Sequence, residues 1–380
     1  MSVLNRTEAE INLENLAHNF REIKNFTNGA DIIAVVKADA YGHGALEVAA
    51  LYEKLGASIL AVACLDEALF LRSGGISAPI MILGATPIHL AKFLTENELI
   101  QSVPSLEYAK SLDSAARELK KKISVHIKLD TGMSRFGIYS HSSFAKSAAE
   151  DVFEITKLPN LIPDGIFTHF AEAENPDTAF TDEQFESFMH VVEILKERGK
   201  TFRFCHCANS SAVVNYKRAH LNCVRPGLIL YGYSPDGNPV PGLDLRPSLT
   251  FKALIGDVRR VFAGDSLSYN RTFVADKDMT VAVVSCGYAD GVPRALSNRA
   301  SFLINGHRAK ILGNVCMDLT IVDVTDIPDV KPFDEAIVFG GEKSAFLSPF
   351  EQAKHAGTIS YELLTSISKR VPRTYFSQEA

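Results

Sequence analysis

The sequence predicts an α/β protein, with an N-terminal (β/α)8 barrel of the TIM type and a C-terminal, mostly β domain. Two observations predict it. Eight short apolar runs alternate with longer amphipathic stretches in the first 235 residues, and β-rich runs with hairpin signals follow. Short apolar strands separated by helices are typical of a parallel sheet covered on both faces, and eight such units in about 200–250 residues have the size of this barrel.

The eight apolar runs are the expected barrel strands. The stretches between them have helical spacing, and the clearest case, 105–122, begins with a capping residue, Ser105. A doubly wound sheet is the alternative, but its Gly-rich first turn is absent from KADAYGHG, residues 37–44. The expected strands are 31–36, 58–63, 78–83, 99–104, 123–129, 163–170, 202–207 and 222–232.

The second domain is indicated by a change of composition. Residues 234–247 are rich in Pro, Gly and Asp, which is typical of a linker. The runs after it are β-rich, and Asn305-Gly306 is a hairpin-turn signal. We therefore expect residues 1–238 to form the barrel and 239–380 the β domain, with the first ten or so residues able to join the β domain.

The composition is that of a globular protein, with 46% hydrophobic and 22% charged residues. A net charge of -6 argues against nucleic acid or an anionic membrane as partner. No run reaches the roughly 18 apolar residues of a membrane span, and the N-terminus lacks a signal-peptide pattern. The six cysteines lack the spacing of a zinc or redox motif, so we expect reduced thiols, no metal and a cytoplasmic location.

Functional side chains of such a barrel lie where its strands end at their C-terminal side. The first apolar run ends on Lys37, and a desolvated lysine has a lowered pKa and acts as a nucleophile or base. Taken alone, Lys37 is more simply the first solvated residue after the strand. Polar side chains follow other strands too, however: Tyr41, Lys128, Asp130, Arg135, Thr168, His169, His206, Asn209, Ser210, Ser211 and Arg225.

A phosphate fits the ends of the last two strands. Ser210 opens a helix and Gly227 lies in a turn, although Asn209-Ser210 is equally well read as a helix cap. A strand-end lysine facing a phosphate indicates a carbonyl cofactor that carries a phosphate and is held as a Schiff base. Pyridoxal 5'-phosphate is the candidate.

At these residues the chain resembles the bacterial alanine racemases, pyridoxal-phosphate enzymes with a barrel and a β domain. The resemblance runs from about residue 6 to the C-terminus. The blocks that carry it are AVVKADAYGHG, IKLDTGMSRFG, FTHF, HCANSSA, VRPGLILYG, SYN, GYADGVPR, NVCMD and SYELLTSISKRVPR.

The resemblance implies a role for each matching residue. Lys37 would hold the cofactor as an aldimine and act as one catalytic base, and Tyr269 of the partner subunit in a homodimer would be the other. Arg135, and Met317 of the partner subunit through its backbone, would bind substrate. Lys128 is at a position that is often carbamylated in this family. The residues implied in cofactor binding are Lys37, Tyr41, His169, His206, Ser210, Arg225, Gly227, Leu228 and Tyr361, and those at the entrance are Tyr288 and Arg294.

The implied activity interconverts L-alanine and D-alanine by two-base proton transfer, supplying D-alanine for peptidoglycan. The alternative is a racemase for serine or a broader set of amino acids on the same scaffold; Tyr288 and Tyr361 suggest a narrow mouth and favour alanine. A barrel decarboxylase would have a run of glycines for the phosphate and an acid in place of Arg225. A cofactor carrier would lack the β domain and Tyr269.

Three positions depart from the family or from other pyridoxal enzymes. Arg225 would face the pyridine nitrogen, and because a guanidinium only donates hydrogen bonds, that nitrogen should stay unprotonated, which discourages transamination. Asn270 follows Tyr269 where the family usually has Gly, and Ser134 stands where Gly is common.

Overall fold

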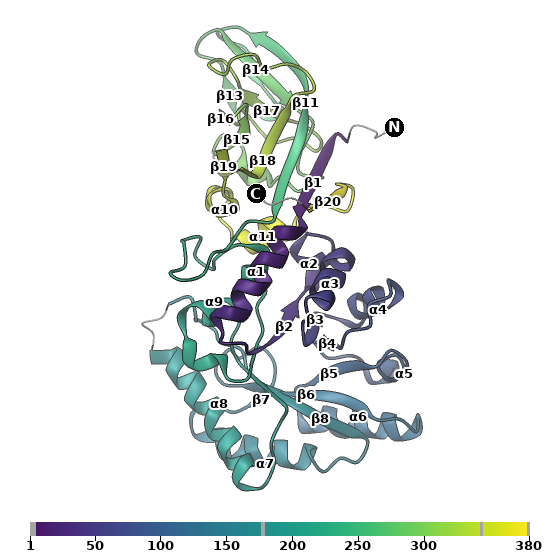
Figure 1. Ribbon diagram of the computed structural model, residues 1–380. Helices are drawn as coiled ribbons and strands as arrows, with labels where there is room; N and C mark the ends of the chain where they lie inside the picture. The colour runs from purple at the N-terminus through teal and green to yellow at the C-terminus, as the bar shows by residue number, and fades with distance from the viewer. Residues whose placement is uncertain (1–4, 176–178, 343–344, 378–380) are drawn as a thin grey trace. The chain divides into compact units, whose positions relative to one another are not determined.

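The structure is a computed structural model that describes residues 5–175, 179–342 and 345–377. The chain divides into two compact units. We call residues 17–40 and 45–246 the barrel unit, and the described part of residues 1–16, 41–44 and 247–380 the β unit. Figure 1 shows both units and labels many of their helices and strands.

The barrel unit contains a nearly closed parallel sheet in the strand order β10-β2-β3-β4-β5-β6-β8-β9, so the predicted (β/α)8 barrel is confirmed. Each predicted apolar run carries one strand. Where β9 and β10 meet, the N–H of Arg225 donates to the carbonyl of Ala208 at 2.9 Å. The strands are β2 (Asp31–Val35), β3 (Ile59–Val62), β4 (Ile80–Ile82), β5 (Leu99–Val103), β6 (Ile123–Asp130), β8 (Leu161–Phe167), β9 (Phe204–His206) and β10 (Cys223–Val224), with β7 (Ile138–Tyr139) beside β6.

The last strand is shorter than the apolar run 222–232 predicted. The strand ends at Val224, and Leu228–Tyr231 form a 3₁₀ helix, η4. Pro226 has no N–H to donate to a sheet, and Gly227 turns the chain away with φ −122° and ψ −93°. The apolar side chains of η4 are buried all the same, which explains why the run resembles a strand.

Helices surround these strands (Figure 1). The predicted cap at Ser105 is confirmed, because its side chain accepts the N–H of Tyr108 at 3.1 Å. The helices are α1 (Leu13–Phe26), α3 (Ala45–Lys54), α4 (Leu65–Ser73), α5 (Ala91–Glu96), α6 (Leu106–Glu118), α7 (Ala145–Ile155), α8 (Ala179–Glu197) and α9 (Ser210–Asn215).

The β unit is built on a nine-stranded sheet whose main path is β16-β15-β18-β11-β1-β20. The N-terminal strand β1 lies between two C-terminal ones, antiparallel to β11 and parallel to β20. The strands are β1 (Thr7–Asn12), β11 (Leu249–Val261), β14 (Met279–Val284), β15 (Ser301–Ile304), β16 (His307–Lys310), β17 (Thr320–Asp323), β18 (Glu335–Glu342), β19 (Ala345–Leu347) and β20 (Arg373–Phe376), beside the small pair β12 (Ser266–Leu267) and β13 (Phe273–Val274) and the helices α10 (Pro349–Ala356) and α11 (Ser360–Thr365).

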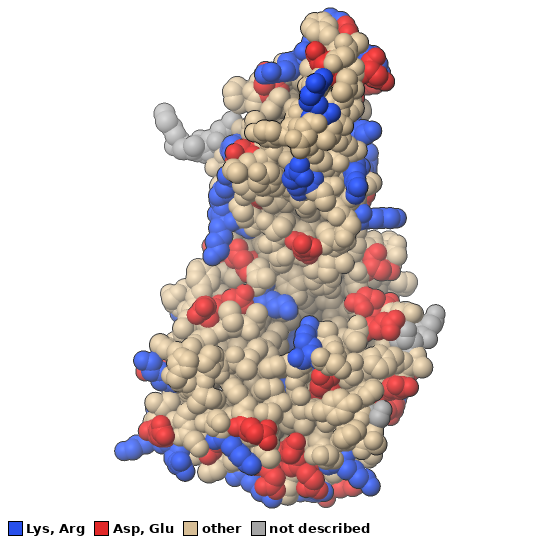
Figure 2. All heavy atoms as spheres, turned by 180° about the vertical axis from the view of Figure 1, so that it is seen from behind, with Lys and Arg blue, Asp and Glu red and all other residues tan. Residues whose placement is uncertain are grey.

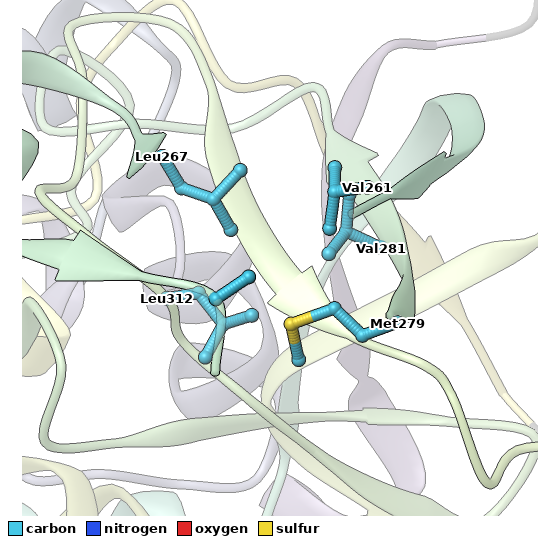
Figure 3. Packing of buried hydrophobic residues seen from close by; sticks show 6 residues of the cluster. Val261, Leu267, Met279, Val281 and Leu312 are labelled. Atoms are coloured by element: carbon cyan, nitrogen blue, oxygen red, sulfur yellow. The ribbon is translucent and has the colours of Figure 1, made fainter. Parts of the chain in front are cut away.

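Two features show why the β unit folds locally as it does. The predicted hairpin turn is confirmed: Asn305 and Gly306 have φ of 47° and 77° and join β15 directly to β16. A small core then packs under β11 and β14. Figure 3 shows its side chains converging: Val261, Leu267, Met279, Val281 and Leu312.

Charged side chains of both signs are interspersed over the face shown in Figure 2. Within the residues that the structure describes, no helix is both long enough and apolar enough to cross a bilayer.

Candidate active site

Lys37 opens a strained turn at the end of β2. In the segment Lys37–Tyr41 (α2), the four residues after the lysine have φ between 51° and 54°. This left-handed conformation costs a residue with a side chain about 1–2 kcal/mol. Glu67 offsets the cost, because one carboxylate oxygen accepts the N–H of Ala38 at 2.7 Å and the other accepts that of Ala63 at 2.7 Å. The turn is thereby tied to the end of β3.

The Lys37 amine is half-buried among cations. Burial is the main cause that lowers its pKa; Arg135 and Arg225 lower it further, while Glu67 opposes them. A lowered pKa increases the neutral fraction of the amine, which is the nucleophilic form. Lys37 is therefore suited to attack a carbonyl group.

Arg225 is buried, at 3% exposed, and held by three acceptors. Its guanidinium donates to Nδ1 of His206 at 2.7 Å, to Nδ1 of His169 at 2.9 Å and to the carbonyl of Thr168 at 2.9 Å. Burial, and then the charge of Arg225, holds the pKa of both imidazoles well below the ordinary value. The Phe167 ring stacks on His206 at 4.8 Å between ring centres. The result is a rigid cationic group beside two neutral rings.

Lys128 is a second lysine whose amine has a lowered pKa. It points from β6 and donates to the carbonyl of Leu129 at 2.8 Å. Its pKa is lowered to about 7, by burial first and then by Arg225; Asp130 raises it and Arg135 lowers it further. At neutral pH a large part of this amine is therefore uncharged.

The loop that carries Arg135 is shaped by Asp130. One carboxylate oxygen of Asp130 accepts the N–H of Gly132 at 3.1 Å and that of Ser134 at 2.9 Å. Ser134 has a φ of 54°, in the left-handed region that favours glycine. Arg135 follows as an exposed residue whose charge acts on Lys37 and Lys128.

The two helix starts after β9 and β10 are in contact. The Ser210 hydroxyl accepts the N–H of Gly227 at 2.9 Å, while Asn209 caps α9 by accepting the N–H of Ala212 at 2.9 Å. The cap is therefore Asn209, and the hydroxyl of Ser210 faces the turn instead. Leu228, the next residue, opens η4 and is buried.

Tyr269 lies on a strained loop of the β unit. Ser268 has φ 64° and ψ −177°, and Asn270 has φ 63°. The Ser268 hydroxyl donates to the Asn314 carbonyl at 2.5 Å, and the Asn314 amide donates to the carbonyl of Tyr269 at 2.7 Å. The backbone is thus fixed on both sides of a tyrosine that is 71% exposed.

Met317 is held by the block that carries Tyr288. The N–H of Tyr288 donates to the Cys316 carbonyl at 3.0 Å, and that of Ala289 to the Met317 carbonyl at 3.0 Å. A Cβ on Gly287 would lie 2.3 Å from the Cys316 carbonyl oxygen, so only glycine permits this approach. The segment that carries Tyr288 and the segment that carries Met317 are therefore held in a fixed position relative to each other.

Buried Asp290 anchors the same block. Its carboxylate accepts hydrogen bonds from Arg6 and Arg370 and from the N–H of Gly287 at 2.9 Å, and these partners lower its pKa against the opposing effect of burial. Arg294, by contrast, opens the short helix η6 (Arg294–Leu296) and is exposed.

Tyr41 and Tyr361 pair within the β unit, with ring centres 5.9 Å apart and planes tilted by 51°. Gly42 makes this possible, because its φ is 83° and a Cβ there would lie 2.2 Å from the carbonyl oxygen of Leu364 in α11.

The structure brings the predicted residues together in groups. The barrel unit joins Lys37, Lys128, Arg135, His169, His206 and Arg225 in one electrostatic cluster, with Ser210 and Gly227 in mutual contact. The β unit links Tyr269 to the block of Met317 through Asn314, and pairs Tyr41 with Tyr361. Among the described residues, no set of three His, Cys, Asp or Glu side chains could hold a metal ion.

Two residues of these groups were missed from sequence. Glu67 lies in the first turn of α4 and carries no signal beyond that position. His126 contacts His206 and lies inside the apolar run 123–129. The sequence signal for His126 is its place between Val125 and Ile127, since a buried strand normally carries an apolar side chain at such a position.

Comparisons with known proteins cover almost the whole chain. A family model described as "Alanine racemase, N-terminal domain" matches residues 11–235, and "Alanine racemase, C-terminal domain" matches residues 248–375. The alanine racemase of Desulfosudis oleivorans is 41% identical over 373 residues, covering 97% of this chain and 96% of that protein. That of Clostridium tetani is 42% identical over 369 residues, covering 97% and 94%.

Solved structures agree with these relatives. The alanine racemase of Clostridium difficile superposes with a TM-score of 0.92 at 37% identity, over 99% of this chain and 97% of that one. The alanine racemase of Bacillus anthracis with bound L-Ala-P gives a TM-score of 0.90 at 34% identity, over 99% and 96%.

Proposed function

The chain belongs to the alanine racemase family, and from this we propose that it interconverts L-alanine and D-alanine and supplies D-alanine for peptidoglycan. The observation that carries the proposal is Lys37: an amine with a lowered pKa at the C-terminal end of a barrel strand, beside Arg135 and Arg225. A carbonyl-bearing anion fits this combination of a nucleophile and local positive charge.

We propose pyridoxal 5'-phosphate as the cofactor, because the donors present fit its groups. Lys37 offers an amine for the aldehyde, and Arg225, fixed by His206 and His169, offers a donor for the pyridine nitrogen. The helix starts at Ser210 and at Gly227-Leu228 suit the phosphate. The resemblance implies the same role for Tyr41 and Tyr361, whose rings pair within the β unit. When bound, this cofactor makes the α-proton of the amino acid acidic.

We propose that two residues move that proton. Nζ of Lys37 takes or returns it on one face of the substrate α-carbon, and Oη of Tyr269 of the partner subunit does so on the other. The lowered pKa of Lys37 favours this, since a base works best with a pKa near the working pH. Arg135 and the backbone of Met317 of the partner subunit hold the substrate carboxylate, and Tyr288 and Arg294 line the entrance.

Lys128 is proposed to be carbamylated. Only a neutral amine adds carbon dioxide, and a pKa of about 7 provides that form at neutral pH. The addition forms an N–C bond and releases one proton, and the resulting anion would lie beside Arg135 and Arg225 and offset their positive charges.

We propose a homodimer in which residues 239–380 supply Tyr269 to the partner. Support comes from the exposure of Tyr269, at 71%, and of Met317, at 52%, on one block of the β unit. A cytoplasmic location is supported by the cysteines, which are all unpaired thiols.

Substrate choice is tested by kcat/KM for L-alanine, L-serine and L-lysine with the purified protein and added pyridoxal phosphate. Alanine should be preferred over serine by at least tenfold. A comparable value for serine would favour the broader racemase on the same scaffold.

The role of Lys37 is tested by Lys37→Ala with pyridoxal phosphate. The variant should lose both racemisation and the visible absorbance of the protein-bound Schiff base. Lys196→Ala, which changes an exposed lysine on α8, is the matched control and should keep both. A wild-type protein that stays colourless after loading would contradict the proposal.

A further inference from the structure

His126 is a buried histidine in the barrel interior, on β6, with an exposed fraction of zero. Its Nδ1 lies 3.0 Å from Nε2 of His206. Its own Nε2 is buried without a hydrogen-bond partner among the described residues. An unpartnered buried polar atom destabilises a fold, so packing alone does not explain a histidine here.

The direction of hydrogen bonding along this chain follows from Arg225. A guanidinium has donors only, so Nδ1 of His206 accepts from it and bears no proton. The neutral His206 ring then carries its proton on Nε2 and donates to Nδ1 of His126. Donation therefore runs from Arg225 to His206 to His126, and His126 is the terminal acceptor.

The neutral state of the last two rings agrees with this direction. Burial, followed by the charge of Arg225, lowers the pKa of His126 to about 3 and that of His206 well below the ordinary value. A protonated His126 would present a donor to the donor of His206. The chain thus has one consistent arrangement of protons.

The neighbouring strand leaves space for this ring. Gly165 on β8 is the register partner of His126, and a Cβ on it would lie 2.5 Å from His126 Nδ1. The Phe204 ring packs against the His126 ring, with 5.6 Å between the ring centres. The His126 ring is therefore held where its Nδ1 meets His206.

We propose that His126 is a positioning residue: as the acceptor for Nε2–H of His206, it fixes the tautomer of His206 and thereby the acceptor that orients Arg225. Without it, the His206 proton is free to move to Nδ1, where it opposes the donor of Arg225. Arg225 would then be held by His169 and Thr168 but not by His206. Only the effect on racemisation rests on the proposed function.

The tautomer is tested in the full-length protein without added ligand. Long-range ¹⁵N–¹H correlation spectra of ¹⁵N-histidine-labelled protein distinguish the protonated from the bare ring nitrogen, and a His206→Gln spectrum assigns the signals. His126→Leu should move the His206 proton partly or wholly from Nε2 to Nδ1. His126→Asn should not, because its Oδ1 can accept at the position of Nδ1.

Gly165→Ala is the second variant, in case His126→Leu fails to fold. It keeps His126 but displaces the ring, and Gly165 does not have the left-handed φ that would add backbone strain. It should give the same tautomer change. A His206 proton that stays on Nε2 in whichever of these two variants folds would overturn the proposal.

Kinetics of the protein loaded with pyridoxal phosphate provide the second readout. His126→Leu should lower kcat by about tenfold with little change in KM for alanine, and His126→Asn should restore kcat to within about threefold of wild type. Equal losses in the Leu and Asn variants would also overturn the positioning role. The spectra remain decisive even if the wild-type protein does not racemise alanine, so the two failures are distinguishable.

Discussion

Glu67 accepts the N–H of Ala38 at 2.7 Å, one residue beyond Lys37. The same carboxylate holds the N–H of Ala63 at the end of β3 and raises the pKa of Lys37, against the larger effect of burial. Glu67 thus holds the strained turn in place and also favours the protonated form of the Lys37 amine, at the first residue of that turn.

Removing this carboxylate should lower the pKa of Lys37. Glu67→Gln removes the charge and keeps one acceptor for the turn, whereas Glu67→Ala removes both. We expect a lower Lys37 pKa in both variants and slower cofactor loading in Glu67→Ala. The measurement is the pH dependence of Lys37 modification by pyridoxal phosphate and borohydride, read by peptide mass.

Glu53→Gln is the matched control for Glu67, because Glu53 also binds backbone N–H groups, at Ser77 and Ala78. It should leave the Lys37 pKa unchanged. An unchanged or higher Lys37 pKa in Glu67→Gln would show that the carboxylate does not act on the amine.

Lys128 should make stability depend on pH. Its pKa falls from 10.5 to about 7 on folding, so between these values the unfolded chain binds more protons, and stability rises with pH. The slope is at most about 1.4 kcal/mol per pH unit for one group. In Lys128→Met this contribution should vanish, as measured by denaturant unfolding between pH 7 and 9 without carbon dioxide.

Carbon dioxide is the control for Lys128. Bicarbonate should stabilise the wild-type protein in this pH range and leave Lys128→Met unaffected. Parallel pH profiles for the two proteins would mean that Lys128 remains charged when folded.

Arg225→Glu should raise transamination relative to racemisation. A carboxyl group can support a protonated pyridine nitrogen, whereas the guanidinium only donates to it. The ratio of pyruvate formed to alanine racemised measures the partition. The same ratio in the variant and in the wild type would refute this role of Arg225.

Ser134→Gly should stabilise the protein. At φ 54° a side chain is strained, and glycine removes that strain at a smaller cost in unfolded-state entropy, for a net gain of about 0.5–1 kcal/mol. Ser134→Ala keeps the strain and serves as the control. In equilibrium denaturation, Ser134→Gly should have a higher free energy of unfolding than the wild-type protein, and Ser134→Ala should have an equal or lower one. A Ser134→Gly variant no more stable than the wild type would contradict the presence of strain at this position.

Subunits carrying Lys37→Ala and Tyr269→Phe should complement each other. In a shared-site dimer, a mixed dimer has one site with both changes and one intact site. Equal amounts of the two chains, refolded together, should recover about a quarter of wild-type activity, because half of the dimers are mixed. No recovery would place Tyr269 and Lys37 of one site on the same subunit.

The strands were predictable because a parallel sheet buried on both faces requires apolar side chains at successive positions, as at Ile32, Ile33 and Ala34. The same rule misled most at Leu228–Tyr231, which are buried in a 3₁₀ helix. The hairpin turn was also predictable from local sequence, because Asn305 and Gly306 both favour the positive φ that the turn requires.

What sequence could not predict depends on partners far along the chain. Glu67 meets Ala38 across 29 positions, and His126 meets His206 across 80. The left-handed turn after Lys37 was also unpredictable, because Ala38 and Ala40 have no preference for positive φ and adopt it only under tertiary constraint.

The place of β1 between β11 and β20 has a consequence for synthesis on the ribosome. β1 is made before the barrel strands, but its partners, residues 249–253 and Arg373–Phe376, follow them in the sequence. It remains without these partners while the intervening chain is made, whereas each of the barrel strands from β2 to β8 pairs with the next barrel strand in sequence. Folding of the barrel can therefore proceed during translation, but the sheet of the β unit is completed only once Arg373–Phe376 have been made.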